Sequence, residues 1–214
     1  MSVQVKICGL TNLEDARAAL DAGADLLGFI FYPKSLRYIQ PQQVQAILEN
    51  LAREQGQVIT VGVFVNTPVE EVQRILDLCG LDLAQLHGEE TPEDMNVLDG
   101  RGYKALRPRS AEEALELSQA YLQATHPMQP ALLLDAYHPD LRGGTGITGD
   151  WNAAVGLAKT CSLLLAGGLN PTNVVDAIRA VQPWGVDVSS GVECAPGKKD
   201  HAALAALIRA AKAV

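Results

Sequence analysis

The chain has 214 residues, of which 48% are hydrophobic and 20% are charged, which is ordinary for a globular protein. Its 25 acidic and 17 basic residues give a net charge of −8, which argues against a nucleic-acid surface, because such a surface needs clustered lysine and arginine. No apolar run approaches the roughly 20 residues that span a bilayer, and the first strand-like run begins at residue 3 without an apolar leader, so we expect a cytoplasmic protein with no membrane partner.

Short runs rich in valine, isoleucine and leucine recur along the chain, and we predict a strand at residues 3–7, 26–31, 58–65, 81–87, 103–107, 131–135, 162–166 and 185–189. Segments with a period of 3.6 residues predict helices at 12–22, 41–52, 68–79, 111–124, 150–159, 171–181 and 200–213. Pro92, preceded by Thr91, marks one further helix start. Continuous apolar runs are typical of strands buried on both faces, as in a parallel sheet.

Eight strand-plus-helix units predict an α/β protein that forms a single (β/α)₈ TIM barrel, with one domain over residues 1–214. No linker, low-complexity tract or block of like charge interrupts the alternation. The length is near the lower end for such barrels, which begin at about 200 residues. The alternative is an open α/β sheet, which would more often show fewer strands and a dinucleotide fingerprint.

The four cysteines stand far apart and include no CxxC pair: Cys8, Cys79, Cys161 and Cys194. The spacing excludes a zinc ribbon and argues against a disulfide framework in a chain of this size, so a reducing cytoplasm is expected. We expect three of them to pack as small hydrophobic residues. Cys8 is the exception, because it stands at the end of a strand.

The predicted strands end at Cys8, Phe31, Asn66, His87, Arg107, Asp135, Gly167 and Ser189, and all of these residues except Phe31 are polar residues or glycine. Because parallel strands of a barrel end on the same face, this face is the expected active site.

The loops after the seventh and eighth strands, residues 166–173 and 186–193, are rich in small residues. Gly167 and Gly168 let the backbone approach a ligand closely, and Ser189 and Ser190 add hydroxyl donors. These positions often form a phosphate site in (β/α)₈ barrels. A single glycine pair would be explained by a tight turn, whereas two such loops favour phosphate binding.

Cys8 and Asp135 end the first and sixth strands, so both side chains can face the mouth of the barrel. A carboxylic acid there can donate a proton, and a thiol can act as a base where its surroundings favour the thiolate. Taken alone, Cys8 reads as a buried apolar residue, and Asp135 as a helix cap or a salt-bridge partner. Only their joint position favours catalysis.

Other candidate residues are weaker when taken singly. Arg37 has a guanidinium that suits a carboxylate, but it could equally be a surface arginine. His87 ends the fourth strand, but the sequence has no second metal ligand at a useful spacing from it, so a metal site is not expected there. Asp187 lies between two valines, where burial is costly unless its carboxylate meets a partner or a ligand hydroxyl. The glycine-rich loop 141–146 could close over a substrate.

Together these segments resemble the phosphoribosylanthranilate isomerase family. The similar segments run in family order over nearly the whole chain: KICG (6–9), EDA (14–16), GFIFYPKSLRYI (28–39), GVFVN (62–66), QLHG (85–88), LLLDAY (132–137), GGTG (143–146) with DW (150–151), AGGLNPTNV (166–174) and VDVSSGVE with PGKKD (186–200). The family is a small (β/α)₈ barrel without a cofactor or metal, so the resemblance agrees with the fold expected from the pattern.

The resemblance implies an Amadori rearrangement with Cys8 as general base and Asp135 as general acid. It implies that Arg37 holds the anthranilate carboxylate and that the loops around Gly168 and Ser190 hold the phosphate. We place four further residues with them as substrate-binding: His87, Gly144, Asp187 and Gly191. The chain departs from the family where Leu36 replaces a usual proline, Asn12 a common arginine and Gly149 a usual phenylalanine. These departures put in doubt the shape and flexibility of the second and sixth loops.

Three other functions are alternatives to this one. A histidine-pathway or dual-substrate aminoaldose isomerase shares the chemistry but resembles a pattern with aspartate in both catalytic places, which Cys8 does not match. A non-catalytic phosphate-metabolite-binding barrel would lack the acid or the base. Indole-glycerol-phosphate synthase would need a lysine–glutamate pair at the strand ends. The expected partner is a small phosphorylated substrate, and the protein is expected to be a monomer or a homodimer.

Overall fold

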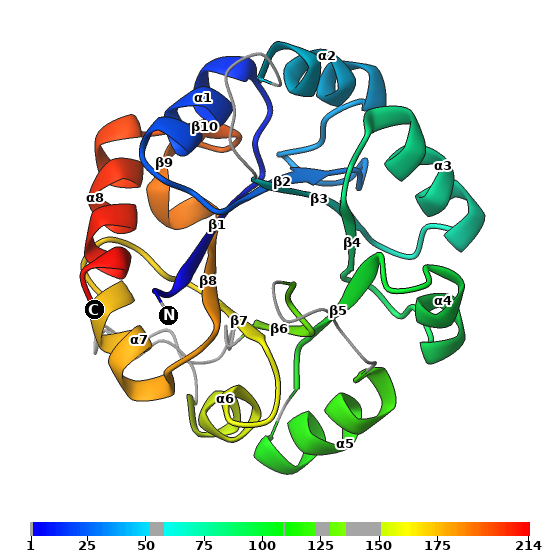
Figure 1. Ribbon diagram of the computed structural model, residues 1–214, viewed down its shortest axis with the longest axis vertical. Helices are drawn as coiled ribbons and strands as arrows, with labels where there is room; N and C mark the ends of the chain where they lie inside the picture. Colours follow the sequence, from blue (N-terminus) through cyan, green and yellow to red (C-terminus); the bar gives the residue numbers. More distant parts are fainter. Residues whose placement is uncertain (1, 52–57, 109, 123–128, 136–150) are drawn as a thin grey trace.

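A closed barrel of eight parallel strands forms the centre of the computed structural model, which describes residues 2–51, 58–108, 110–122, 129–135 and 151–214. Figure 1 shows the strands as an inner ring and the helices as an outer ring. The strands are β1 (Gln4–Cys8), β2 (Leu26–Ile30), β3 (Ile59–Phe64), β4 (Leu83–Leu86), β5 (Gly102–Leu106), β6 (Leu132–Asp135), β7 (Leu163–Ala166) and β8 (Gly185–Val188).

The helices between the strands are α1 (Leu13–Asp21), α2 (Pro41–Leu51), α3 (Val69–Cys79), α4 (Pro92–Val97), α5 (Ala111–Tyr121), α6 (Trp151–Ala158), α7 (Val174–Val181) and α8 (His201–Lys212). Several begin as the capping residues predict. The Asn12 side chain accepts from the Asp15 N–H at 2.8 Å, and Thr91 and Asp94 form a reciprocal capping box at α4. None of the described helices is long and apolar enough to cross a membrane.

Pairing of β1 with β8, which joins Lys6 to Asp187 and Ile7 to Val188, closes the sheet. This closure confirms the predicted TIM barrel and shows that the open-sheet alternative is wrong.

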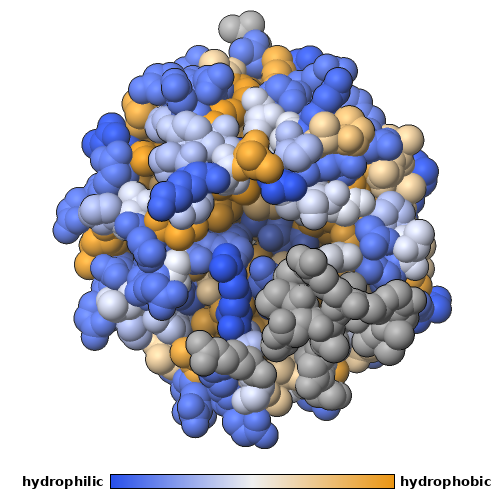
Figure 2. Space-filling view, turned by 180° about the vertical axis from the view of Figure 1, so that it is seen from behind, coloured by the Kyte–Doolittle hydropathy of each residue, from blue (hydrophilic) through white to orange (hydrophobic). Residues whose placement is uncertain are grey.

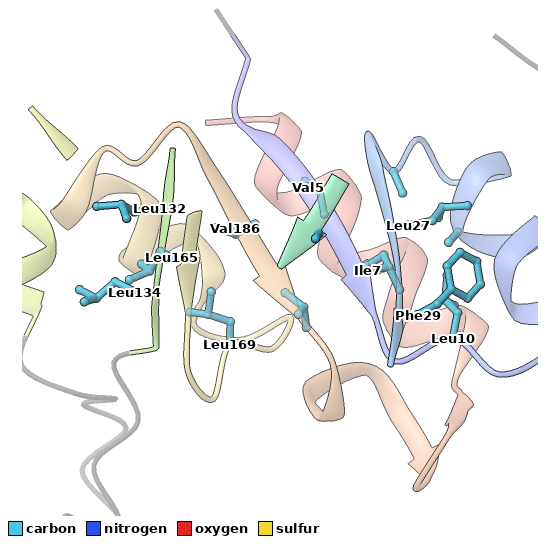
Figure 3. Close-up of a cluster of buried hydrophobic side chains, with 14 of the residues drawn as sticks. Val5, Ile7, Leu10, Leu27, Phe29, Leu132, Leu134, Leu165, Leu169 and Val186 are labelled. Carbon is cyan, nitrogen blue, oxygen red and sulfur yellow. The ribbon is translucent and has the colours of Figure 1, made fainter. Parts of the chain in front are cut away.

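Side chains alternate along the strands between the layer beneath the helices and the inside of the barrel. Val5, Ile7, Leu132 and Leu134 belong to the layer between the sheet and the helices (Figure 3). Leu133 belongs to a separate cluster inside the barrel. Since successive strand residues point to opposite faces, Lys6 and Cys8 on β1 and Asp135 on β6 point inward. The alternation therefore directs the polar strand ends to the barrel axis.

Two local features differ from the sequence predictions. Helix α7 begins at Val174 instead of residue 171. The reason is a turn before the helix, in which Asn173 Oδ1 accepts from the Asn170 N–H at 2.8 Å and Asn170 Oδ1 accepts from the Thr172 N–H at 2.9 Å. After β8 the chain forms a short 3₁₀ helix, η1 (Ser190–Val192), and an antiparallel hairpin of β9 (Glu193–Ala195) and β10 (Lys198–Lys199), none of which was predicted.

Candidate active site

The molecule is hollowed near the middle of one face (Figure 2). A cavity of about 430 Å³ lies at the carboxyl ends of the strands and is lined by residues of β1, β2, β3, β4, β6, β7 and β8 and of the loops after β4, β7 and β8. It brings together most of the residues singled out in the sequence: Cys8, His87, Asp135, Gly168, Asp187, Ser190 and Gly191. Gly144 and the rest of loop 141–146, together with Gly149, lie outside the described residues. Arg37 is not among the residues that line the cavity.

Cys8 is buried at the end of β1 and opposite Gly28 of β2. A Cβ at Gly28 would lie 2.9 Å from Cys8 Sγ, so the glycine makes room for the thiol. Burial raises the pKa of Cys8 above its ordinary value, and the nearby ammonium groups of Lys6 and Lys199 only partly oppose this. Cys8 is therefore mainly a thiol at neutral pH in the free protein.

Lys6 forms a buried cationic floor beneath the cavity, and sequence reasoning assigned it no role. Its Nζ donates to Gln85 Oε1 at 2.6 Å and lies 3.1 Å from Asp187 Oδ1. Burial alone would lower the pKa of Lys6, but Asp187 and the neighbouring Cys8 and Tyr103 raise it, so the side chain is a cation. The ion pair supplies the partner that the position of Asp187 between two valines requires.

Gln85 connects this floor to the opposite wall. Its Oε1 also accepts from Tyr103 Oη at 2.8 Å, and its Nε2 lies 2.9 Å from His87 Nδ1. His87 Nε2 in turn lies 3.1 Å from Arg107 Nε and 3.9 Å from Asp135 Oδ2. Burial, assisted by the positive charge of Arg107, lowers the pKa of His87 to about 3, so the imidazole is neutral near pH 7.

Asp135 lies at the end of β6, which β7 and β8 separate from the β1 strand of Cys8, so the two side chains line the cavity from different strands. Its carboxylate is 25% exposed and lies 3.8 Å from Arg107 Nε. A carboxyl group and a thiol thus face one cavity from two strands, which is an arrangement suited to transferring protons to and from one bound molecule.

The glycine-rich loops after β7 and β8 form another part of the wall. Gly167 and Gly168 have φ values of +104° and +66°, and the carbonyl of Gly168 accepts from Asn173 Nδ2 at 3.1 Å. A Cβ at Gly191 would lie 1.9 Å from the Leu169 carbonyl oxygen, so the two loops touch only because this residue is glycine. Within the described ranges, the buried Ser189 Oγ has no hydrogen-bond partner. These loops present small residues, backbone and a hydroxyl to the cavity, as a phosphate requires.

Arg37 stands in the loop after β2 and packs over the residue that follows Cys8. A Cβ at Gly9, which has a φ of +74°, would lie 2.6 Å from Arg37 Cδ. The guanidinium forms a two-bond ion pair with Glu193, at 2.8 Å from Nε to Oε1 and 2.7 Å from Nη2 to Oε2. Leu36, one of the departures from the family pattern, is 77% exposed beside it.

Lys199 holds the Arg37–Glu193 pair in place through its ammonium group. Its buried Nζ donates to Glu193 Oε1 at 2.9 Å, to the Cys8 carbonyl at 2.7 Å and to the Ser189 carbonyl at 3.1 Å. Sequence reasoning missed both Lys199 and Glu193. Lys199 belongs to the PGKKD segment, but a lysine in a loop gives no sequence signal that its ammonium is buried.

The other cysteines fit the expectation only in part. Cys79 is buried and Cys161 is half-buried, but Cys194 is exposed, so the expectation that it packs as a small hydrophobic residue is wrong. It stands on β9, which pairs with β10 in a two-stranded sheet separate from the barrel, and its side chain there is exposed. In the described ranges, no group of three or more His, Cys, Asp or Glu side chains is arranged to hold a metal ion.

Comparisons with known proteins agree with one another. A family model described as N-(5′-phosphoribosyl)anthranilate (PRA) isomerase matches residues 5–210. The N-(5′-phosphoribosyl)anthranilate isomerase of Pelobacter propionicus is 48% identical over 210 residues, which are 98% of this chain and 96% of that protein.

Solved structures give the same result. A phosphoribosyl anthranilate isomerase from Thermotoga maritima has a TM-score of 0.85 and 39% identity, and the match covers 99% of this chain and 100% of that one. A phosphoribosyl anthranilate isomerase in complex with reduced 1-(o-carboxyphenylamino)-1-deoxyribulose 5-phosphate has a TM-score of 0.82 and 39% identity at the same coverage. Monomers generated from the dimeric T. maritima protein match with a TM-score of 0.82 and 38% identity, again over 99% and 100% of the two chains.

Proposed function

Since the chain belongs to the family of N-(5′-phosphoribosyl)anthranilate isomerases, we propose that Cys8 is the general base and Asp135 the general acid of its reaction. The enzyme is an aldose–ketose isomerase of tryptophan biosynthesis that converts N-(5-phosphoribosyl)anthranilate to 1-(2-carboxyphenylamino)-1-deoxyribulose 5-phosphate by an Amadori rearrangement. The observation that carries the proposal is that both residues line one cavity, from β1 and from β6.

Ring opening comes first. Asp135 gives a proton to the ribose ring oxygen, the C1′–O4′ bond breaks, and the nitrogen lone pair forms a protonated Schiff base at C1′. Asp135 is suited to this step because its carboxyl group is partly exposed at the cavity wall, where a ring oxygen can reach it.

Proton abstraction follows. The Cys8 thiolate takes the proton from C2′, and the electrons of that C–H bond move into a C1′–C2′ double bond as the iminium nitrogen regains its lone pair. Tautomerisation of the resulting enolamine, with a proton lost from O2′ and one gained at C1′, gives the ketone. The iminium ion accepts the electrons, so this sequence of steps uses no external oxidant.

The charge state of Cys8 depends on its surroundings. Burial raises its pKa in the free protein, whereas the cation of Lys6 acts in the opposite direction. A cationic Schiff base in the cavity adds a further positive charge and favours the thiolate more strongly. The base therefore becomes active mainly after ring opening, in the order that the chemistry requires.

The remaining site residues bind the substrate in this proposal. The loops around Gly168, Ser190 and Gly191 hold the phosphate through backbone N–H groups, and Arg37 holds the carboxylate through its guanidinium. Asp187 and His87 line the same cavity and bind the sugar hydroxyls in this proposal. Gly144, which lies outside the described residues, belongs to a loop proposed to cover the substrate.

We also infer that the barrel is a single domain over residues 1–214 and that the enzyme works in the cytoplasm as a monomer or homodimer. The widely spaced cysteines, which include no CxxC pair, support a reducing compartment.

Incubation with freshly prepared phosphoribosylanthranilate tests the activity, with the loss of its anthranilate-type fluorescence as the readout. Wild-type protein should remove the fluorescence, and Cys8→Ser and Asp135→Asn should each lower the turnover number by about 10²–10⁴-fold while retaining substrate affinity. The aminoaldose of the histidine pathway should give no turnover, because Cys8 stands where that enzyme is expected to have aspartate. Near-full turnover by either variant would show that the acid–base assignment is wrong.

A further inference from the structure

The ammonium group of Lys199 makes the full set of three hydrogen bonds that it can donate. Its acceptors are the carbonyl of Cys8 at the end of β1, the carbonyl of Ser189 after β8, and Glu193 on β9. The Lys199 side chain has no exposed surface, and its backbone N–H donates to Asp15 Oδ2 at 2.9 Å. Its position is therefore determined on every side.

Glu193 is held as firmly as Lys199. Its side chain is 5% exposed, Oε1 accepts from both Lys199 Nζ and Arg37 Nε, and Oε2 accepts from Arg37 Nη2. Burial would raise the pKa of Glu193, but the hydrogen bonds from Arg37 and Lys199 outweigh it and lower the pKa below its ordinary value. Glu193 is consequently a carboxylate with a fixed orientation.

The pair determines which edge of Arg37 is available. Glu193 occupies Nε and Nη2, whereas Nη1 donates to no protein group in the described part of the chain. The Arg37 side chain is 23% exposed, unlike its two buried partners. Without Glu193, the long side chain would have to lose its rotational freedom when a ligand binds.

The charges of the three side chains also match one carboxylate. Two cations, Lys199 and Arg37, surround one anion, Glu193, which leaves a single positive charge in the cluster. Arg37 paired with Glu193 alone would be neutral and would attract a substrate carboxylate weakly. Lys199 therefore restores the attraction that Glu193 would otherwise cancel.

We propose that Glu193 and Lys199 are positioning residues that aim Arg37 at the carboxylate of the anthranilate ring and so set the preference of the enzyme for a carboxylated aromatic amine. This inference rests on the proposed role of Arg37. A merely structural role of the two residues, in joining β1 to β8, would instead impair all substrates alike.

The test compares two substrates that differ only in the carboxylate: phosphoribosylanthranilate and phosphoribosylaniline. The readout is the ratio of their kcat/KM values in wild type, Glu193→Gln and Arg37→Ala. Glu193→Gln should lower this ratio by about tenfold or more, chiefly through a higher KM for the anthranilate compound, because hydrogen bonds between charged groups are the strong ones. Its kcat/KM for the aniline compound should stay within about threefold of wild type.

The control for ion-pair loss is Glu71→Gln, because Glu71 forms the same two-bond pair with Arg74 on the exposed surface of α3, with both bonds at 2.6 Å. Neither substrate should be affected by it. Competitive inhibition by inorganic phosphate should be unchanged in Glu193→Gln, which shows that the other end of the site is intact. If circular dichroism shows that Glu193→Gln does not fold, Glu193→Asp takes its place, and the shorter acid should lower the same ratio by a smaller factor.

Each outcome decides between the two roles. An equal loss on both substrates in Glu193→Gln, or an unchanged ratio, overturns the positioning role even if Arg37→Ala abolishes the preference. A preference that survives in Arg37→Ala shows instead that the carboxylate assignment of Arg37 is wrong, and the inference fails with it.

Discussion

Replacing Lys6 with methionine should destabilise the protein more than any loss of an exposed ion pair. Methionine keeps most of the volume and removes the charge, so Asp187 keeps a buried carboxylate without its counter-ion. Lys6 has no exposed side-chain surface, and the Asp187 side chain is only 10% exposed, so solvent cannot replace the lost partner. Gln85 Oε1 also loses a donor at 2.6 Å.

The expected loss is about 3–5 kcal/mol of unfolding free energy, the cost of removing one partner from a buried pair. For a protein of this size the melting temperature should fall by about 6–20 °C. Urea unfolding at pH 7 measures the loss. Asp77→Asn is the control, because it breaks the exposed pair with Arg101 and should cost less than about 1 kcal/mol.

The double variant Lys6→Met/Asp187→Asn should recover a large part of the loss, because it removes both buried charges together. The reasoning would be refuted if Lys6→Met cost no more than Asp77→Asn. It would also be refuted if the double variant were as unstable as Lys6→Met alone.

Four further predictions follow from the site. Arg37→Ala should raise KM for phosphoribosylanthranilate more than it lowers kcat, since the carboxylate contact exists in ground and transition states alike; steady-state kinetics with an unchanged KM and a collapsed kcat would contradict this. Gly191→Ala should raise KM or destabilise the fold by about 1–3 kcal/mol, because its Cβ would lie 1.9 Å from the Leu169 carbonyl oxygen, and wild-type kinetics and melting temperature would refute that close contact. The pKa of His87 is lowered to about 3 from an ordinary 6.5, so the unfolded state binds the proton first and the unfolding free energy should fall by at most about 5 kcal/mol as pH drops from 6.5 toward 3. In urea unfolding, the stability of His87→Gln should depend less on pH than that of wild type, and an equal pH dependence would contradict the burial of His87. The rate at which iodoacetamide alkylates Cys8, measured by mass spectrometry, should increase with pH, and the midpoint of this increase should lie above the ordinary thiol pKa. Lys6→Met should move the midpoint to higher pH, and a shift to lower pH would show that Lys6 does not favour the thiolate.

The barrel was predictable because each level of the sequence agrees with it. The buried runs are mainly apolar, as is typical of parallel strands inside a shell of helices. Residues such as Asn12 and Thr91 mark the helix starts. The start of α7 was not predictable, since the side chains of Asn170 and Asn173 form a turn that no periodicity records.

Of the site, the strand-end residues and the glycine loops were predictable, whereas the buried ion pairs were not. Cys8 and Asp135 end apolar runs, which is a local signal, and the glycine loops show themselves by composition. Lys6 was missed because it is one charged residue in an apolar run, and only barrel closure places Asp187 opposite it. Arg37 and Glu193 are 156 residues apart, so no spacing rule could pair them. The buried polar network is thus a product of the tertiary fold.

Trapping of the open-chain Schiff base tests the division of labour between Cys8 and Asp135 most directly. Each variant is mixed with phosphoribosylanthranilate and cyanoborohydride, and mass spectrometry measures the reduced open-chain amine above an enzyme-free control. Cys8→Ser should accumulate the trapped amine, because Asp135 still opens the ring and no base removes the C2′ proton. Asp135→Asn should give no more than the control. Accumulation in Asp135→Asn and not in Cys8→Ser would contradict the account and reverse the two roles.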